Sequence, residues 1–80
     1  VELLLRFHPS AAWRVRDYFH PKEISVQPDG HLLARCTFPE DQWLLSFLLS
    51  FGSQLEVLSP AYWRDVLVQE SKKISDLYET

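Results

Sequence analysis

Residues 23–35 read EISVQPDGHLLAR, and this stretch predicts a β-hairpin at the centre of the fold. Proline pre-sets one backbone angle of a turn and glycine accepts a positive one, so residues 28–30 form the turn. A three-residue loop with Gly30 left-handed sets Ile24 opposite Ala34. A two-residue loop would instead set Ile24 against Arg35. We favour the longer loop because a register slip moves one strand's side chains to the wrong face.

The residues on either side of the hairpin predict the other elements. Alternating apolar residues indicate strands, helical spacing indicates helices, and prolines mark several boundaries. The expected strands are residues 2–8, 22–27 and 54–58, together with the second strand of the hairpin. The expected helices run from Pro9 or Ser10 to Pro21, over residues 39–51, and from Ser59-Pro60 to about Tyr78. This order predicts an α+β, ferredoxin-like βαββαβ sandwich: a four-stranded antiparallel sheet plus a C-terminal helix. Two helices cover one sheet face, and the other face is open or covered by the last helix or a partner.

Length, charge and composition limit the function classes. The 80 residues have room for one domain, 1–80, and the net charge of −3 makes the chain a poor candidate for gripping DNA. One cysteine fits a reducing compartment and a cytoplasmic location. The longest apolar stretch, 43–51, is too short to span a bilayer, so no membrane partner is expected. The absence of methionine indicates that Val1 is not a natural start and that the chain is a fragment of a longer protein.

Arg6 and Arg35, with His8, form the candidate effector site. Strand alternation points both arginines to the open sheet face, where two guanidinium groups could bind a phosphate or a carboxylate. An anionic small molecule or a nucleic-acid segment is the expected ligand. The competing interpretation pairs Arg35 with Glu23, and Arg6 with Glu2 or Glu56, as ordinary solvated ion pairs. Such pairs are common on open sheet faces, and the sequence does not decide between the two.

Several apolar side chains lie off the predicted core faces and are candidates for a subunit interface. They are Trp13, Leu45, Leu49, Tyr62 and Val68. For the two leucines, contact with the neighbouring helix of the same layer is the simpler explanation, and a lone exposed tryptophan needs none. The last helix also carries Glu70 inside its apolar stripe. Either this carboxylate reaches an arginine of the open sheet face, or the helix bends away from the domain.

Catalytic and metal-binding machinery is not visible. His8, His20 and His31 lack metal-ligand spacing, and Cys36 reads as a small buried hydrophobic residue, so neither a metal nor a cofactor is expected. RNA recognition on this fold stacks bases on aromatic residues of the open face, where this chain has aliphatic and charged ones. The plan resembles acylphosphatase too, but that chemistry relies on an asparagine, which this chain lacks. We therefore predict that the chain is not an enzyme.

The C-terminal half carries a family resemblance. Residues 50–60, SFGSQLEVLSP, followed by Trp63-Arg64, resemble the end of WYL-domain regulators, where a helix ends in an "sFG" turn, a strand reads "VL-P" and a final helix opens near "LR". Here Trp63 stands where leucine is usual. Leu5-Arg6-Phe7 is similar to the "LRF" strand of that region, and Asp29-Gly30 to its hairpin turn. The resemblance covers nearly all of the chain.

The resemblance implies a role as well as a fold. It identifies the chain as a C-terminal extension, or WCX, domain of a WYL-domain-containing, DeoR-like bacterial transcriptional regulator. Such modules are ferredoxin-like and are implicated in dimerisation and effector sensing, so a homodimer is expected. DNA binding is implied for a winged helix-turn-helix of the parent protein, which this chain lacks. The alternative is a free-standing ferredoxin-like regulatory domain that binds a small molecule.

Overall fold

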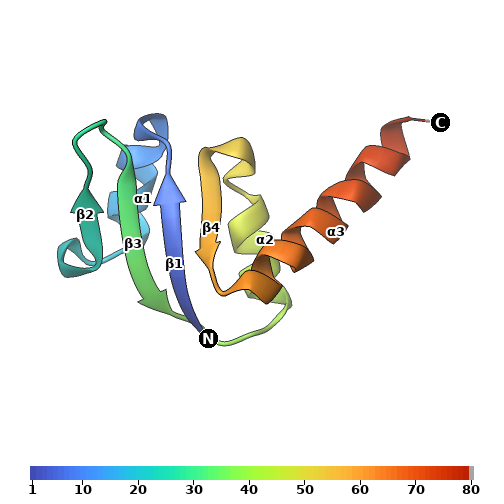
Figure 1. Ribbon diagram of the computed structural model, residues 1–80, viewed down its shortest axis with the longest axis horizontal. Helices are drawn as coiled ribbons and strands as arrows, with labels where there is room; N and C mark the ends of the chain where they lie inside the picture. The colour runs from blue at the N-terminus through green and yellow to red at the C-terminus, as the bar shows by residue number, and fades with distance from the viewer. Residues whose placement is uncertain (80) are drawn as a thin grey trace.

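The sheet has the strand order β2-β3-β1-β4, and every neighbouring pair is antiparallel. In the computed structural model, which describes residues 1–79, the elements follow the predicted sequence (Figure 1). They are β1 (Glu2–Phe7), α1 (Ala12–Tyr18), β2 (Ile24–Val26), β3 (Leu32–Thr37), α2 (Gln42–Leu49), β4 (Leu55–Ser59) and α3 (Ala61–Tyr78). The ferredoxin-like α+β fold with an added C-terminal helix is therefore confirmed.

The hairpin between β2 and β3 has the predicted register. Ile24 lies opposite Ala34, and the loop is closed by a hydrogen bond of 2.9 Å from the Gly30 amide to the Gln27 carbonyl. Gly30 has a φ of 90°, a conformation that favours glycine. Strand β2 is shorter than predicted because Pro21–Glu23 form a 3₁₀ turn, capped by the His20 side chain.

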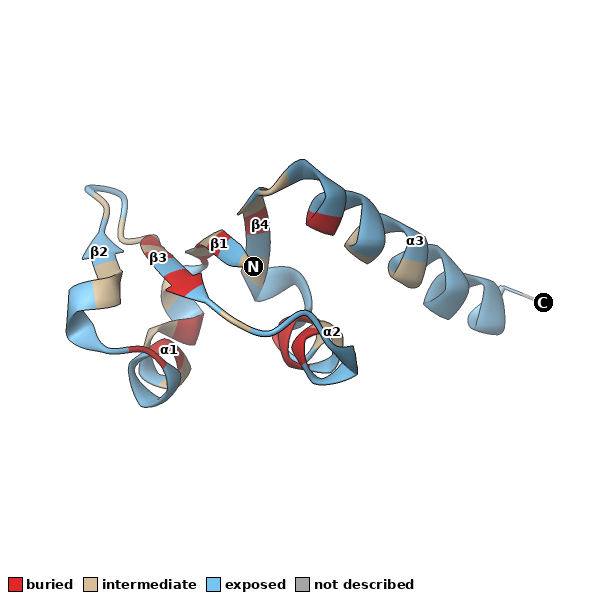
Figure 2. Ribbon diagram, turned by 90° about the horizontal axis from the view of Figure 1, so that it is seen from below, coloured by how far each residue is buried: buried red, intermediate tan, exposed pale blue. Residues whose placement is uncertain are grey.

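Helices α1 and α2 lie on one face of the sheet, and the core fills the space between the layers (Figure 2). Alternate residues of β1 and β3 point into it, as the sequence pattern predicts. The buried apolar residues are Leu3, Leu5, Phe7, Ala11, Val15, Phe19, Leu32, Ala34, Cys36, Leu44, Phe47, Leu48, Phe51, Val57 and Trp63. Each large aliphatic or aromatic side chain buried in this way contributes about 1.5–3 kcal/mol.

All three helix starts differ from the prediction. Helix α1 begins at Ala12 rather than at Pro9 or Ser10, because Pro9–Ala11 form a 3₁₀ turn capped by the His8 side chain. Helix α2 begins at Gln42 rather than near Pro39, because the Asp41 side chain accepts a hydrogen bond of 3.0 Å from the Leu44 amide. Aspartate is among the strongest N-cap residues, and Asp41 itself has the extended backbone of a cap residue. Helix α3 begins at Ala61 with Pro60 as its cap residue, later than the predicted start at Ser59-Pro60. Ser59 is instead the last residue of β4, paired with Leu4.

Arg14, on α1, contacts the end of α2 and so links the two helices that cover the sheet. Its guanidinium carbon lies 4.0 Å from the centre of the Phe51 ring, and its Nη1 donates a hydrogen bond of 2.9 Å to the Ser50 carbonyl. A cation over an aromatic face is attracted by the ring quadrupole. The end of α2 is thus held against α1 by a residue that the sequence pattern does not single out.

Helix α3 projects away from the domain beyond strand β4 (Figures 1 and 2). Trp63 is buried and Leu67 half-buried, whereas the distal apolar residues Ile74 and Leu77 are 43% and 73% exposed. Glu70 pairs with Lys73 on its own helix, at 3.7 Å. Of the two alternatives for Glu70, the structure therefore favours a helix that leaves the domain, and the open sheet face is not covered by α3.

Candidate functional site

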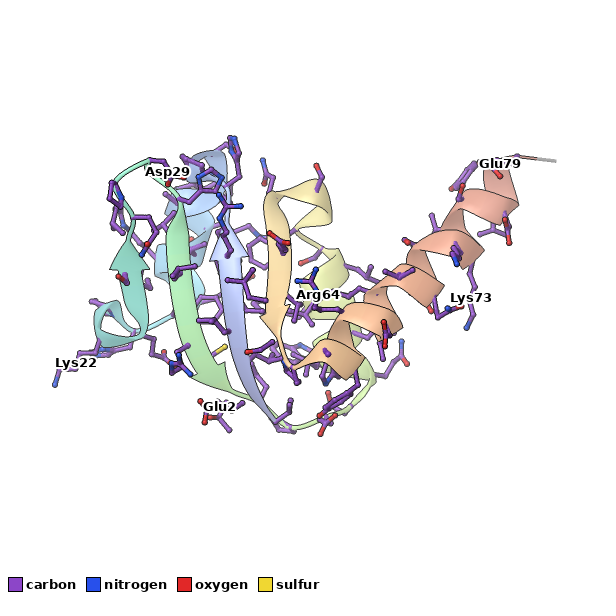
Figure 3. The ribbon with its side chains drawn as sticks, in the orientation of Figure 1. Glu2, Lys22, Asp29, Arg64, Lys73 and Glu79 are labelled. Atoms are coloured by element: carbon purple, nitrogen blue, oxygen red, sulfur yellow. The ribbon has the colours of Figure 1, made fainter. Side chains whose placement is uncertain are left out.

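A shallow cavity of about 110 Å³ lies where the end of β1 meets the β2–β3 hairpin and the start of β4. Its lining residues are Arg6, His8, His31, Ser53, Gln54, Leu55 and Glu56. Strand β1 positions Arg6 on the open face, and His8 follows the strand directly. Asp29 lies at the same end of the sheet (Figure 3). The structure thus brings together two of the three predicted site residues.

Arg6 is flanked by two carboxylates. Its Nη2 lies 3.6 Å from Asp29 Oδ2 and its Nη1 lies 3.6 Å from Glu56 Oε1. Glu56 is one of the two carboxylates that were predicted to pair with Arg6. The other predicted pairing, with Glu2, is wrong. Both ion pairs are long and solvent-exposed, and such pairs contribute about 0–1 kcal/mol. The guanidinium group is therefore oriented by its neighbours but only weakly held.

Arg35 lies outside the cavity. Its Nη1 donates a hydrogen bond of 3.1 Å to Glu2 Oε1, and both side chains are well exposed. The predicted pairing with Glu23 is wrong, because Glu23 accepts a hydrogen bond from the His20 amide and completes the cap of the 3₁₀ turn. In the β1–β3 register, Arg35 lies opposite Leu4 and Arg6 opposite Leu33, so the two arginines share the open face but sit on a diagonal.

His31 is the site residue that sequence reasoning missed. Its ring lies edge-on to that of His8, with centroids 5.5 Å apart. The β1–β3 register contains the signal, because Phe7 pairs with Leu32 and the next residues outward are the two histidines. His31 Nδ1 is 3.2 Å from Asp29 Oδ1, and this buried nitrogen has no well-aligned hydrogen bond within the described chain.

Asp29 is held in its charged form by the same loop. The His31 backbone amide donates a hydrogen bond of 2.9 Å to Asp29 Oδ1. This bond is the main cause that lowers the pKa of Asp29, and the charge of Arg6 adds a smaller effect in the same direction. The cavity rim therefore carries an arginine, two imidazoles and the side-chain carboxyl groups of Asp29 and Glu56.

Cys36 is a core residue, as predicted. It is 5% exposed, and burial raises the pKa of its thiol to about 12, with a smaller contribution from the charge of Glu23. Because the thiolate is the reactive form, we expect Ellman's reagent to modify the folded chain about 1,000-fold more slowly than the chain unfolded in guanidinium, at the same mildly alkaline pH. Equal rates for the two forms would contradict this burial.

The interface candidates divide into exposed and half-buried residues. Trp13, Tyr62 and Val68 are 70%, 50% and 49% exposed, whereas Leu45 and Leu49 are half-buried. Leu45 packs against the core from α2, which accounts for its position off the main stripe. None of these placements establishes a subunit contact.

The start of α3 is tied to the loop before α2 through one carboxylate. Glu40 Oε2 accepts hydrogen bonds from the Tyr62 hydroxyl at 2.9 Å and from Trp63 Nε1 at 3.0 Å. Partial burial, and then the hydrogen bond to Glu40, raise the pKa of Tyr62. Glu40 thus holds the start of α3 at the domain.

Two further observations concern metals and membranes. Within residues 1–79, no three side chains of the metal-ligand types gather closely enough to hold an ion. No helix in the described part of the chain combines the length and the apolar character needed to cross a bilayer.

Comparison with known proteins adds the family. The WCX domain family matches residues 1–75. This chain is a WCX domain. The match confirms the predicted resemblance to the C-terminal domain of WYL-type regulators.

Two curated proteins are similar in sequence to this WCX domain. An uncharacterized HTH-type transcriptional regulator, YobV of Bacillus subtilis, is 36% identical over 80 residues, which cover 99% of this chain and 26% of that protein. Protein PafC of Mycobacterium tuberculosis is 38% identical over 56 residues, which cover 70% of this chain and 17% of that protein. The WCX domain thus spans about a quarter or less of the length of these relatives, and the comparison supports a regulatory role.

Proposed function

We propose that this WCX domain is the effector-sensing and dimerisation module of a WYL-type helix-turn-helix transcriptional regulator. The observation that carries the sensing role is the convergence of Arg6, His8 and His31 on one cavity. The similarity to YobV, an HTH-type transcriptional regulator by name, supports the wider role. The longer protein would bind DNA through an N-terminal domain, and the bound effector would alter the geometry of two chains and so the spacing of their DNA-binding domains.

The chemistry of the cavity suits an anion. Arg6 has only long contacts to Asp29 and Glu56, so an incoming phosphate or carboxylate at hydrogen-bonding distance would compete well for it. Each of the two imidazoles has a ring N–H that can donate a hydrogen bond to an anion. Arg6, His8 and His31 would therefore offer donors to a bound anion and offset the two carboxylates of the rim.

The size of the cavity limits which part of a ligand it holds. Pockets that enclose whole drug-sized ligands measure about 300–1,000 Å³, and this cavity of about 110 Å³ suits one phosphate or carboxylate group. The remainder of an effector would lie across the open sheet face, where Leu33 lies opposite Arg6. A small acid or a nucleotide of a single strand has this combination of an anionic end and an apolar or planar body.

Replacing Arg6 by alanine is expected to weaken sulfate binding about tenfold or more, since a charge-assisted hydrogen bond contributes about 1.5–3 kcal/mol. Sulfate is the probe because its charge stays constant near neutral pH. Binding is measured from amide shifts in nuclear magnetic resonance spectra, which should move at His8, His31 and Gln54.

The matched control is Arg35→Ala, which removes the same charge from the same sheet face outside the cavity. It should change the sulfate affinity less than about twofold, because exposed charges interact weakly across a sheet. Shifts centred on Arg35, or none at the cavity, would contradict the proposed site. A parallel titration with a short single-stranded oligonucleotide distinguishes a nucleic-acid effector from a small anion.

A further inference from the structure

The apolar stripe of α3 is only half used by its own domain. Its members are Trp63, Leu67, Glu70, Ile74 and Leu77, at successive spacings of four, three, four and three residues. The first two pack on the domain, and the last two lie beyond the sheet edge and are 43% and 73% exposed. Alternating steps of three and four residues are the pattern of the a and d positions of a two-helix coiled coil.

We propose that α3 packs antiparallel against α3 of a second copy of this chain. This inference rests on the homodimer of the proposed function and names the surface that forms it; it does not depend on the anion site. A two-fold arrangement is self-complementary, because each helix has one seated half and one unpartnered half. The distal half of each α3 would then lie against the seated half of the other, and both stripes would be covered.

A groove receives the distal half. It has a volume of about 410 Å³ and runs between the edge strand β4 and α3. Its lining residues are Leu55, Glu56, Val57, Arg64, Asp65, Leu67 and Val68. The apolar part of this lining matches Ile74 and Leu77 of a partner. The same contact would also cover β4, whose outer edge has no neighbouring strand in the described sheet.

Charge along α3 favours the antiparallel direction. Arg64 stands at the rim of the groove, held by a hydrogen bond of 2.7 Å to the Val57 carbonyl and an ion pair of 3.6 Å with Glu56. The far end of the helix carries Asp76 and Glu79. Antiparallel packing brings this acidic end toward the partner's Arg64, although Asp65 lies beside it. Parallel packing would place the two acidic ends together and align the helix dipoles.

A substitution at Glu70 tests the proposal in the opposite direction, because it should strengthen the helix pair. Glu70 occupies the centre of the stripe, and among residues 1–79 its ion pair is with Lys73 on its own helix, at 3.7 Å. A charged residue at a coiled-coil seam position lowers stability while it restricts register. Replacing it with leucine should therefore strengthen the helix pair, whereas charges placed at Ile74 and Leu77 should abolish it.

Sedimentation equilibrium of the 80-residue chain measures the dissociation constant. The double substitution Ile74→Glu and Leu77→Glu is expected to raise it at least about 100-fold, and Glu70→Leu to lower it at least about tenfold, as for apolar and charged groups at a buried seam. Val26→Glu is the matched control, because it adds the same charge at a side chain 62% exposed on β2, away from α3. It should leave the constant within about twofold.

The direction is tested with a spin label on Glu79→Cys, since Cys36 is buried and resists labelling. In the antiparallel pair, an overlap that places Leu67 opposite the partner's Leu77 separates the two labels by about 14 residues along the helix axis, which is about 21 Å. Parallel helices would bring the two labels within about 10 Å of each other. A strict monomer, a dimer that survives the double substitution, or labels at the shorter distance would overturn the proposal. A sulfate titration with no binding would leave it standing and refute only the anion site.

Discussion

Replacing Phe7 by alanine is expected to lower the free energy of unfolding by about 3–5 kcal/mol, the range for deletion of a fully buried phenylalanine. Phe7 is fully buried, and its ring contacts Phe19 with centroids 5.7 Å apart and Phe51 with centroids 5.1 Å apart. It therefore joins the central strand to the ends of both covering helices. Native proteins have total stabilities of about 5–15 kcal/mol, so this one substitution should remove a large fraction of the stability of the domain.

Urea denaturation followed by circular dichroism measures this loss. The control is Tyr78→Ala, which deletes an aromatic ring that is 83% exposed near the end of α3. Surface substitutions of this kind change stability by less than about 0.5 kcal/mol. A loss for Phe7→Ala close to that of the control would show that this ring does not connect the sheet to its helices.

The hairpin and the inward-facing residues followed from the sequence because two independent signals agree there. The turn chemistry of residues 28–30 fixes a loop length, and the alternation of the flanking strands admits only one register that keeps apolar side chains together. The structure has that register, with Ile24 opposite Ala34. The alternation of residues along β1 and β3 places Arg6 and Arg35 on the open face, and this too could be predicted.

The partners of those arginines could not be predicted in full. Exposed ion pairs differ by fractions of a kcal/mol, so local geometry decides among several carboxylates within reach. Glu23 does not pair with Arg35, because its carboxylate accepts a hydrogen bond from the His20 amide and caps a 3₁₀ turn. The alternation of the strand residues did not predict this turn. Asp29 forms an ion pair with Arg6 because the hairpin loop lies next to the end of β1.

The position of α3 relative to the sheet could not be predicted from the spacing of its apolar residues. A stripe of apolar residues shows that one helix face avoids water, but it does not show which surface will cover it. Here the deciding contacts are polar and distant in sequence: Glu40, before α2, accepts hydrogen bonds from Tyr62 and Trp63. They set the direction in which the helix leaves the sheet, and no spacing rule connects residues 40 and 63.

Replacing Trp63 by alanine should therefore have the second large effect, a loss of about 3–5 kcal/mol. Trp63 is 5% exposed and is the buried anchor of α3. Its removal takes away the main buried side chain of α3 and leaves Glu40 with the Tyr62 hydroxyl as its one remaining donor from that helix. Isolated helices of this length are marginal in water, so helical circular dichroism should fall along with stability. Trp13→Ala, at a side chain 70% exposed, is the matched control.

The variant Trp63→Phe separates packing from the hydrogen bond. It keeps an apolar ring in the core but leaves Glu40 without the indole donor, which should cost about 1 kcal/mol. If α3 is held mainly by burial, the phenylalanine variant retains its helical signal and the alanine variant does not. If both variants lose it equally, the Glu40 contact determines the position of the helix. If neither does, α3 is stabilised by a partner, and the loss should then appear only when the dimer is diluted below its dissociation constant.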